Sequence, residues 1–450
     1  MLVARAADFD LTPRDGLRQT EAKPIDTSPN PKEPAASRGS PRRILHVDCD
    51  AFFVQVARLE DPEGAGKASL LIVGGSPSGR GVVTSASYEA RAYGVRSAMP
   101  TGQALRLCPN ATVVSVPRGA VGARSTSVRL ALQELAPVVE AASVDEFYLD
   151  LTGTERLFKG ESLAETADRI RRAVVERTEI STSVGGGSNR LIAKLATSRA
   201  KPAGVHIVAA GGEGAFMKEL ELGAIPGVGP ALLAELEKRG LRTVRQALEV
   251  GPEWLARWLG ASRGAWLQAR LQGIGNDEVD PERERKSISS ERTFRADIDE
   301  DEALELWLLR LAESVGHTLR EKGLRTRTVT VKLKDFDFRV RSRALTLPQP
   351  IESDRAIRDT AHALLQDLRR DRLVPARLLG VGLGGLEAGD APRQLALFED
   401  VAGPGETDRE RELSRAVDRV RQRFGRDAVA AARLTAPPTT DDERGERSDG

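Results

Sequence analysis

The sequence predicts a multidomain protein of the α+β class, and three observations lead to this prediction. The chain has 450 residues, a length that corresponds to about three domains. Strand and helix patterns alternate from residue 42 to residue 208, as they do in cores that combine both kinds of element. Short helical patterns follow, and the region after residue 286 reads strand, helix, strand, strand, helix, strand.

The composition limits the kinds of protein that this chain can be. Hydrophobic residues make up 40% and charged residues 30% of the chain, and no apolar run approaches the roughly 20 residues of a membrane-spanning helix. The first 40 residues contain no apolar segment of the kind found in secretory signals. Cys49 and Cys108 are too few for a disulfide framework, so we expect a cytoplasmic location. With a net charge of +1, any affinity for nucleic acid must come from local basic patches.

The first 208 residues have the pattern of a mixed sheet protein after a polar start. Residues 1–41 are rich in Pro, Ser, Asp and Arg without a sustained period, which predicts a disordered extension. Leu163, Ile170 and Val174 recur at helical spacing, which predicts an amphipathic helix over 163–175. The same reasoning predicts strands at 42–48, 70–75, 81–85, 112–116 and 182–187, and helices at 51–59, 88–91, 125–135 and 190–199.

Two adjacent carboxylates, Asp145 and Glu146, lie between apolar residues in a stretch that reads as a β-hairpin. Carboxylates this close repel each other unless positive charge is bound, and divalent cations prefer carboxylate oxygens. A second short apolar run, 44–47, ends at Asp48. If the two strands are neighbours, the three carboxylates converge, and the sequence then predicts a divalent-cation site. The alternative is that Asp145 and Glu146 are solvated turn residues.

Residues 209–279 read as short helices, and the stretch 225–231 resembles a helix-hairpin-helix element. Gly227 and Gly229 allow a tight turn whose backbone can approach a ligand. The helix that follows offers free N–H groups to a phosphate. A simple turn between two helices is the alternative, and in neither case does the element read bases. The polar stretch 276–286 predicts a linker to the next domain.

A basic strand pair is the clearest feature of the region after the linker. Strands are predicted at 327–334, 339–345 and 376–383, with helices at 302–322 and 354–370. Val329, Val331 and Leu333 alternate with polar residues, so one face of the first strand is apolar. An ordinary solvated sheet face is one interpretation of the polar side. The other is a face that binds a polyanion, because five basic residues are predicted to share it: Lys332, Lys334, Arg339, Arg341 and Arg343.

Beyond this region, the stretch 394–398 stands out in a hydrophilic segment. It joins a polar residue to large apolar ones, which predicts a peptide that docks in the groove of a partner protein. Its proposed contact residues are Gln394, Leu395, Leu397 and Phe398. The alternative is a packed terminal strand. Residues 410–434 are predicted to be helical, and the remaining tail is predicted to be polar and disordered.

Together, these segments resemble the Y-family DNA polymerases, and within them the bacterial polymerase IV group, over about residues 42–398. The resemblance is carried, in family order, by 47–53, 87–95, 143–146, 193–196 with 201–204, and 225–229. It implies a right-hand polymerase made of palm, fingers, thumb and little finger. The implied boundaries are a palm at 42–52 and 117–208, fingers at 53–116, a helix-hairpin-helix thumb at 209–279, a linker at 280–286, a little finger at 287–387, a clamp-docking peptide at 388–401 and a partly helical polar tail at 402–450.

The resemblance also implies roles for individual residues. Asp48, Asp145 and Glu146 would be catalytic and would hold two Mg²⁺ ions, with the backbone carbonyl of Cys49 as a further ligand. The ring of Phe53 would act as a steric gate that leaves no room for a 2′-hydroxyl. The little finger and the helix-hairpin-helix would grip the DNA backbones, and the docking peptide would bind the sliding clamp. Further nucleotide contacts are implied for Phe52, Tyr88, Arg91 and Lys201.

The activity implied by the resemblance is error-prone, template-directed DNA synthesis across damaged or stalled templates, without proofreading. The enzyme would be a monomer that uses deoxynucleoside triphosphates and a primer-template. A catalytically inactive scaffold of the same fold would bind DNA and the clamp, but such a protein would be expected to lose a metal ligand or the steric gate. A nucleotide cyclase uses a similar acidic hairpin, but it would not need the helix-hairpin-helix, the basic strands or the docking peptide.

Overall fold

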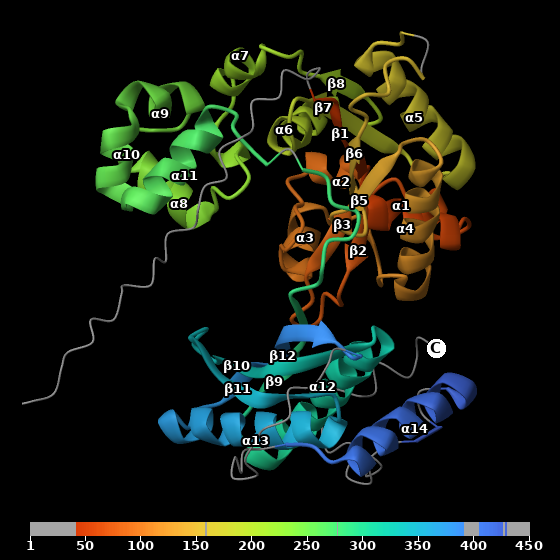
Figure 1. Cartoon of the computed structure of the whole chain (residues 1–450), viewed down its shortest axis with the longest axis vertical. Coiled ribbons are helices and arrows are strands. Elements are labelled where there is room, and N and C mark those ends of the chain that lie inside the picture. Colours follow the sequence, from red (N-terminus) through yellow and green to blue (C-terminus); the bar gives the residue numbers. More distant parts are fainter. Residues whose placement is uncertain (1–41, 158–159, 277, 391–404, 426–427, 430–450) are drawn as a thin grey trace, which may run out of the picture. The chain divides into compact units, whose positions relative to one another are not determined.

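A computed structural model describes residues 42–157, 160–276, 278–390, 405–425 and 428–429 of the chain (Figure 1). The predicted extension 1–41 and the predicted docking peptide 394–398 lie outside these residues. Within the described part, three sheets and several groups of helices follow one another largely in the predicted order. The predicted α+β class is therefore confirmed.

The palm region is built on a five-stranded sheet with the order β5 (Val138–Ala141), β6 (Glu146–Asp150), β1 (Ile44–Cys49), β7 (Thr182–Gly187) and β8 (Val205–Ile207). The central strand β1 is antiparallel to both of its neighbours, whereas β8 is parallel to β7. Three helices pack on this sheet, α4 (Arg118–Gln133), α5 (Leu163–Thr178) and α6 (Arg190–Ala200). Leu45, Val47 and Cys49 belong to the apolar core that the sheet shares with α4 and α5.

Glycines in β7 allow α6 to lie close against the sheet. A Cβ atom on Gly185 would lie 2.1 Å from the backbone nitrogen of Thr197, and one on Gly187 would lie 2.4 Å from the side chain of Ile192. Atoms cannot approach so closely, so both positions require glycine. The close approach brings α6 next to alternate residues of β1, among them His46, whose Nδ1 lies 2.9 Å from Oγ1 of Thr197.

The fingers region contains a three-stranded sheet with the order β3 (Val83–Ala86), β2 (Leu71–Gly74) and β4 (Thr112–Val114). Helix α1 (Phe52–Glu60) leads into it from the end of β1, and the short elements η1 (Ala65–Lys67), α2 (Tyr88–Ala92) and α3 (Thr101–Leu107) complete it. Neither α3 nor β8 is predicted from the sequence. At 7 and 3 residues, they are too short for a hydrophobic period to show.

The thumb region is a group of short helices, α7 (Glu213–Lys218), η2 (Leu222–Ala224), α8 (Pro230–Glu237), α9 (Val244–Val250), α10 (Pro252–Leu259) and α11 (Ala261–Leu271). Between η2 and α8, Gly227 adopts a φ of +98°, which side chains rarely allow. A Cβ atom there would also lie 2.6 Å from the ring of Trp266. Gly229 precedes α8 and faces open space. The predicted tight turn is therefore confirmed, and its first glycine is needed for packing against α11.

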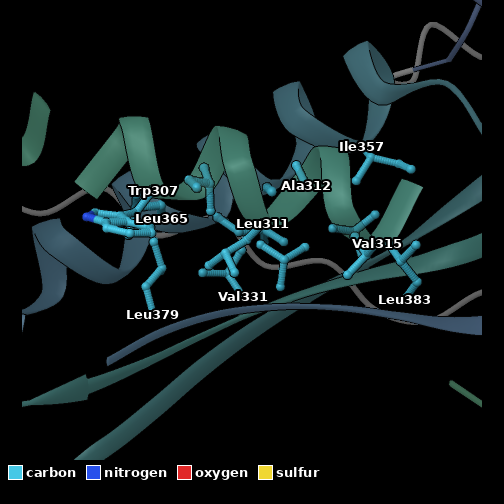
Figure 2. Packing of buried hydrophobic residues seen from close by; sticks show 14 of the residues in the cluster. Trp307, Leu311, Ala312, Val315, Val331, Ile357, Leu365, Leu379 and Leu383 are labelled. Carbon is cyan, nitrogen blue, oxygen red and sulfur yellow. The ribbon is translucent and has the colours of Figure 1, made fainter. Parts of the chain in front are cut away.

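The little-finger region follows the predicted order of strands and helices, with β9 (Ser287–Ile298), α12 (Asp301–Glu321), β10 (Leu324–Asp335), β11 (Val340–Ile351), α13 (Asp354–Asp371) and β12 (Ala376–Ala388). The strands form an antiparallel sheet in the order β11-β10-β12-β9. Both helices cover the same apolar face. Figure 2 shows this core, in which Trp307, Leu311 and Val315 of α12 lie over Val331, Leu379 and Leu383 of the sheet.

A last helix, α14 (Asp408–Phe424), docks on the little-finger helices through polar contacts. Asp418 accepts a hydrogen bond from Nε of Arg320 at 2.6 Å and lies 2.9 Å from Nδ1 of His317. The helix begins close to the predicted start at residue 410 and ends at Phe424, where Gly425 follows with a φ of +95°, and most of the remaining predicted segment up to 434 lies outside the described residues.

Candidate active site

The acidic residues that are predicted to converge lie on two neighbouring strands and in the bend just before one of them. In the register of β1 and β6, Asp48 is the Cα partner of Glu146. The backbone N–H of Cys49 donates to the carbonyl of Asp145 at 2.9 Å, which places Asp145 at the same end of the strand pair. The Asp145 carboxylate accepts a hydrogen bond from the hydroxyl of Ser143 at 2.6 Å. Asp145 and Glu146 are both partly buried, so the arrangement does not favour solvated turn residues.

Two lysines neutralise this acidic cluster. Nζ of Lys201 lies 2.6 Å from Oδ1 of Asp48, and Nζ of Lys194 lies 2.6 Å from both carboxylate oxygens of Glu146. As the side chains stand in the described part of the chain, no group of three His, Cys, Asp or Glu residues is placed to hold a metal ion. The ammonium groups supply the positive charge that close carboxylates need. Each of the two ammonium groups thus lies beside a carboxylate of the cluster.

The surroundings keep Glu146 ionised. His46 and Lys194 hold the pKa of Glu146 down at about 2. Lys194 makes the closer contact of the two, because Nε2 of His46 lies 3.8 Å from the carboxylate, beyond hydrogen-bonding distance. Burial lowers the pKa of His46, so its imidazole is neutral at neutral pH. Burial raises the pKa of Asp48, and the neighbouring Lys201 opposes that shift.

The contact of Lys194 with the cluster is not predicted from the sequence, although a signal for it exists. Lys194 lies on α6 seven residues before Lys201. Lys201 caps the C-terminal end of α6, and seven residues make about two helical turns, so the Cα atoms of the two lysines lie on the same side of the helix axis. Once Lys201 is assigned to the site, this spacing indicates Lys194 as well.

Two of the implied nucleotide contacts lie together on α2. Cζ of Arg91 lies 5.1 Å from the centre of the Tyr88 ring, and Nε of Arg91 donates to the carbonyl of Ala86 at 2.9 Å. The Tyr88 hydroxyl donates to Oδ1 of Asp50 at 3.2 Å. Since Lys201 contacts Asp48, the structure brings Tyr88 and Lys201 to the same end of β1. The sequence reasoning gives Asp50 no role.

The two phenylalanines at the start of α1 differ in burial. Phe52 is only 1% exposed and belongs to the palm core. Because its side chain is buried there, only its backbone could contact a nucleotide. Phe53 is partly buried, and its ring centre lies 5.8 Å from that of Phe52. The fixed ring of Phe52 thus supports Phe53 from the core side.

The prediction that five basic residues share one face of the little-finger sheet is wrong. In the register of β10 and β11, Arg341 pairs with Leu333 and Arg343 pairs with Val331, so both arginines lie on the face that the helices cover. Arg341 contacts the buried carboxylate of Asp335 at 2.9 Å.

The opposite face of this sheet keeps two of the five residues, Lys332 and Lys334, and Lys332 is itself paired with Glu291 at 2.9 Å. Arg339 lies in the turn before β11. The turn between the strands fixes the register, which the alternation of each strand by itself does not reveal. The open face is therefore less positive than predicted.

No helix in the described ranges is long and apolar enough to cross a membrane.

Both cysteines are free thiols and are buried. Burial raises the pKa of the Cys49 thiol, so this side chain is protonated, and only its backbone is suited to the implied ligand role.

Two family models match the sequence. The model described as the impB/mucB/samB family matches residues 47–198, and the model described as the C-terminal domain of that family matches residues 285–397. The first covers the acidic cluster and Lys194 of α6, and it ends before Lys201. The second covers the little-finger region.

Curated relatives match this chain over nearly the whole of their own length. The DNA polymerase IV of Dehalococcoides mccartyi (strain CBDB1) is 36% identical over 392 residues, which are 87% of this chain and 97% of the relative. The DNA polymerase IV of Alkalilimnicola ehrlichii is 39% identical over 362 residues, which are 80% of this chain and 100% of the relative.

Solved structures show the same fold. A Y-family DNA polymerase chimera, Dbh-Dpo4(243-245)-Dbh, superposes with a TM-score of 0.69 at 25% identity and covers 77% of this chain and 99% of its own. The insertion ternary complex of Dbh DNA polymerase gives a TM-score of 0.55 at 26% identity, with coverage of 77% and 99%.

Proposed function

Because this chain belongs to the impB/mucB/samB family of Y-family DNA polymerases, we propose that it extends a primer on a DNA template with two Mg²⁺ ions held by Asp48, Asp145 and Glu146. The family makes it a translesion DNA polymerase, a DNA-directed nucleotidyltransferase that depends on a divalent metal. One observation carries the assignment of the site to these residues. It is the pairing of Asp48 with Glu146 across β1 and β6, with Asp145 at the same strand end.

The donor set fits a divalent metal. Carboxylate oxygens on adjacent strands are the ligands that hard cations prefer, and the carbonyl of Cys49 is the proposed further ligand. The ammonium groups of Lys194 and Lys201 contact the carboxylates of Glu146 and Asp48, respectively. The proposed ions would bind to the same carboxylates. Bound Mg²⁺ would supply a lowered pKa for the primer hydroxyl and charge stabilisation for the leaving pyrophosphate. Glu146, with its pKa of about 2, is ionised and ready as a ligand.

The nucleotide is proposed to lie against the start of α1 and α2. Tyr88, Arg91 and Lys201 would contact the triphosphate, for which an Arg fork and a Lys ammonium are suited. Phe53 would lie under the sugar as the steric gate, supported from the core by Phe52. An incoming ribonucleotide would then place its 2′-hydroxyl against the ring of Phe53.

Primer and template are proposed to bind through their backbones. The turn at Gly227 and Gly229 leads into the N-terminus of α8, whose N–H groups suit a phosphate. On the little finger, Lys332 and Lys334 lie on the open face, and we restrict the proposed DNA contact to these two of the five predicted basic residues. Such contacts carry no sequence information, as a polymerase that copies any template requires.

We also propose that the enzyme is a cytoplasmic monomer without proofreading activity. It is proposed to bind the sliding clamp. The free thiols are consistent with a reducing compartment. An inactive scaffold of the same fold is not favoured, because the carboxylates, the proposed gate and the proposed triphosphate contacts are all present.

Primer extension in defined metal conditions tests the proposed metals and separates the enzyme from a nucleotide cyclase. We expect extension with Mg²⁺ on a primed template, loss of extension after chelation with EDTA, and recovery when Mg²⁺ is returned. Extension that persists in excess EDTA would rule out the metal proposal. Turnover of nucleotide without any template would favour the cyclase.

Deletion of 394–398 tests the proposed clamp peptide. We expect the deletion to remove stimulation by the sliding clamp while unassisted extension stays within about twofold of the intact chain, because a docking peptide adds affinity for its partner and nothing to the chemistry. A chain that lacks the polar residues 441–445 serves as the matched control and should keep the stimulation. Equal losses in the two assays would instead favour the packed strand.

A further inference from the structure

Asp50 is a buried carboxylate that four hydrogen-bond donors surround. It lies directly after β1 and is 4% exposed. Its Oδ1 accepts from the hydroxyl of Tyr88 at 3.2 Å and from the hydroxyl of Ser183 at 2.7 Å. Its Oδ2 accepts from the hydroxyl of Ser181 at 2.9 Å and from the backbone N–H of Ala203 at 2.9 Å.

These bonds set Asp50 apart from the acidic cluster two residues away. A carboxylate offers about four lone-pair directions, and each one at Asp50 faces a donor. The donors are neutral hydroxyl and amide groups, whereas Asp48 faces the ammonium of Lys201. Asp50 is thus satisfied by protein dipoles and has no oxygen left for an ion or a substrate. Its role must be exerted through the groups that it holds.

The four donors come from three separate parts of the chain. Tyr88 is the first residue of α2, and the two serines come from β7 and the residue before it. Ala203 lies in the turn after α6, two residues beyond Lys201. Asp50 therefore joins the fingers helix that carries Tyr88 to the palm turn that carries Lys201.

The backbone of Asp50 is held as firmly as its side chain. Its N–H donates to the carbonyl of Ser181 at 2.9 Å. The side chain of Gln55, on α1, donates to the carbonyl of Asp50 and to that of Ser181, and accepts from the N–H of Ser181 at 2.7 Å. The carboxylate is consequently a fixed reference point, and the groups bound to it are located relative to β1.

We propose that Asp50 is a positioning residue that sets the Tyr88 hydroxyl and the turn carrying Lys201 for binding of the nucleotide triphosphate. The inference rests on the proposed contacts of Tyr88 and Lys201 with that group. Asp50 does not itself touch the nucleotide or the metals. Preorganised donors need no ordering when the ligand arrives, so the benefit appears as tighter nucleotide binding.

The substitution Asp50→Asn tests this role with almost no change of shape. The amide keeps one acceptor oxygen but presents an NH₂ group to two of the four donors. The amide oxygen can stay with the N–H of Ala203 and the hydroxyl of Ser181, so the NH₂ group then faces the hydroxyls of Tyr88 and Ser183. Those hydroxyls must rotate to accept, so the Tyr88 hydroxyl no longer donates to residue 50, and the bonds that remain on the 201–203 turn go to a neutral oxygen. We expect KM for the incoming deoxynucleotide to rise about tenfold while kcat stays within about threefold, because a bond to a charged group is lost without loss of the metal ligands.

Glu140→Gln is the matched control. Glu140 is a buried palm carboxylate on β5, 2.8 Å from Arg190 and outside the proposed nucleotide site. Its substitution should lower thermal stability without raising KM. Ser183→Ala, which removes one donor and leaves the carboxylate, provides a milder second variant and should raise KM in the same direction.

The outcomes separate this inference from the proposed nucleotide contacts. A raised KM in Asp50→Asn and a non-additive combination with Tyr88→Phe would support positioning through Tyr88. An unchanged KM in Asp50→Asn, or a KM change that Glu140→Gln reproduces, would overturn it. Lys201→Ala in the same assay tests the triphosphate contact by itself: if KM rises there but not in Asp50→Asn, the contact stands and the positioning role fails.

Discussion

Replacing Asp145 with alanine is expected to abolish primer extension while binding of the primer-template stays nearly intact. Asp145 lies beside the Asp48–Glu146 pair, and we propose that all three hold the metals. Loss of one ligand removes charge stabilisation that the transition state needs, so the rate should fall about 1,000-fold or more, equivalent to roughly 4 kcal/mol. DNA binding is proposed to depend on the thumb and the little finger, which the substitution leaves unchanged.

Single-turnover extension and a DNA-binding titration measure the two effects side by side. Asp168→Ala is the matched control, because Asp168 is a palm carboxylate on α5 whose partners are Arg171 and Arg172. That variant should keep full activity. If Asp145→Ala unfolds the protein, or extends primers at the rate of the control, the assignment of Asp145 as a ligand is wrong.

Replacing Phe53 with alanine is expected to admit ribonucleotides. The partly buried ring of Phe53 is held from the core side by Phe52, so it cannot retreat from a 2′-hydroxyl. Its removal opens the space that the hydroxyl needs. The ratio of kcat/KM for a deoxynucleotide to that for the matching ribonucleotide should fall about 100-fold.

Phe52→Ala distinguishes a gate from a general loss of packing. Because Phe52 is 1% exposed in the palm core, its truncation should cost about 3–5 kcal/mol of stability. Its effect on sugar discrimination should be smaller than that of Phe53→Ala. Unchanged discrimination in Phe53→Ala would show that another residue forms the gate.

The backbone of the candidate site can be predicted from the sequence because it follows from local rules. Residues in a strand alternate between faces, and carboxylates at the ends of two apolar runs converge if the two strands are neighbours. The observed partnership of Asp48 with Glu146 confirms that reasoning. The strand and helix order of the little finger is predictable for the same reason, since each of its elements is long and periodic.

The side-chain contacts of the site could not be predicted in the same way. The ion pairs of Lys194 and Lys201 depend on how closely α6 approaches the sheet, which the glycines of β7 determine. The four bonds of Asp50 come from segments between 38 and 153 residues away in the sequence. No local pattern records contacts of that range.

Register is the other quantity that the sequence leaves open. Alternation within β11 is evident, but the face on which Arg341 falls depends on the turn that joins β10 to β11. A slip of one residue exchanges the two faces. The error concerning Arg341 and Arg343 has this origin, and it reduces the proposed DNA face to Lys332 and Lys334.

The most direct test of the central claim is primer extension by the full chain on a primed template, with Mg²⁺ and all four deoxynucleotides, beside the variant Glu146→Ala. We expect the wild type to extend the primer in short, distributive steps, and the variant to bind the same primer-template without extending it. Equal extension by both proteins would contradict the assignment of the acidic cluster. A wild type that binds the primer-template but does not extend it would show that this chain is a DNA-binding scaffold and not a polymerase.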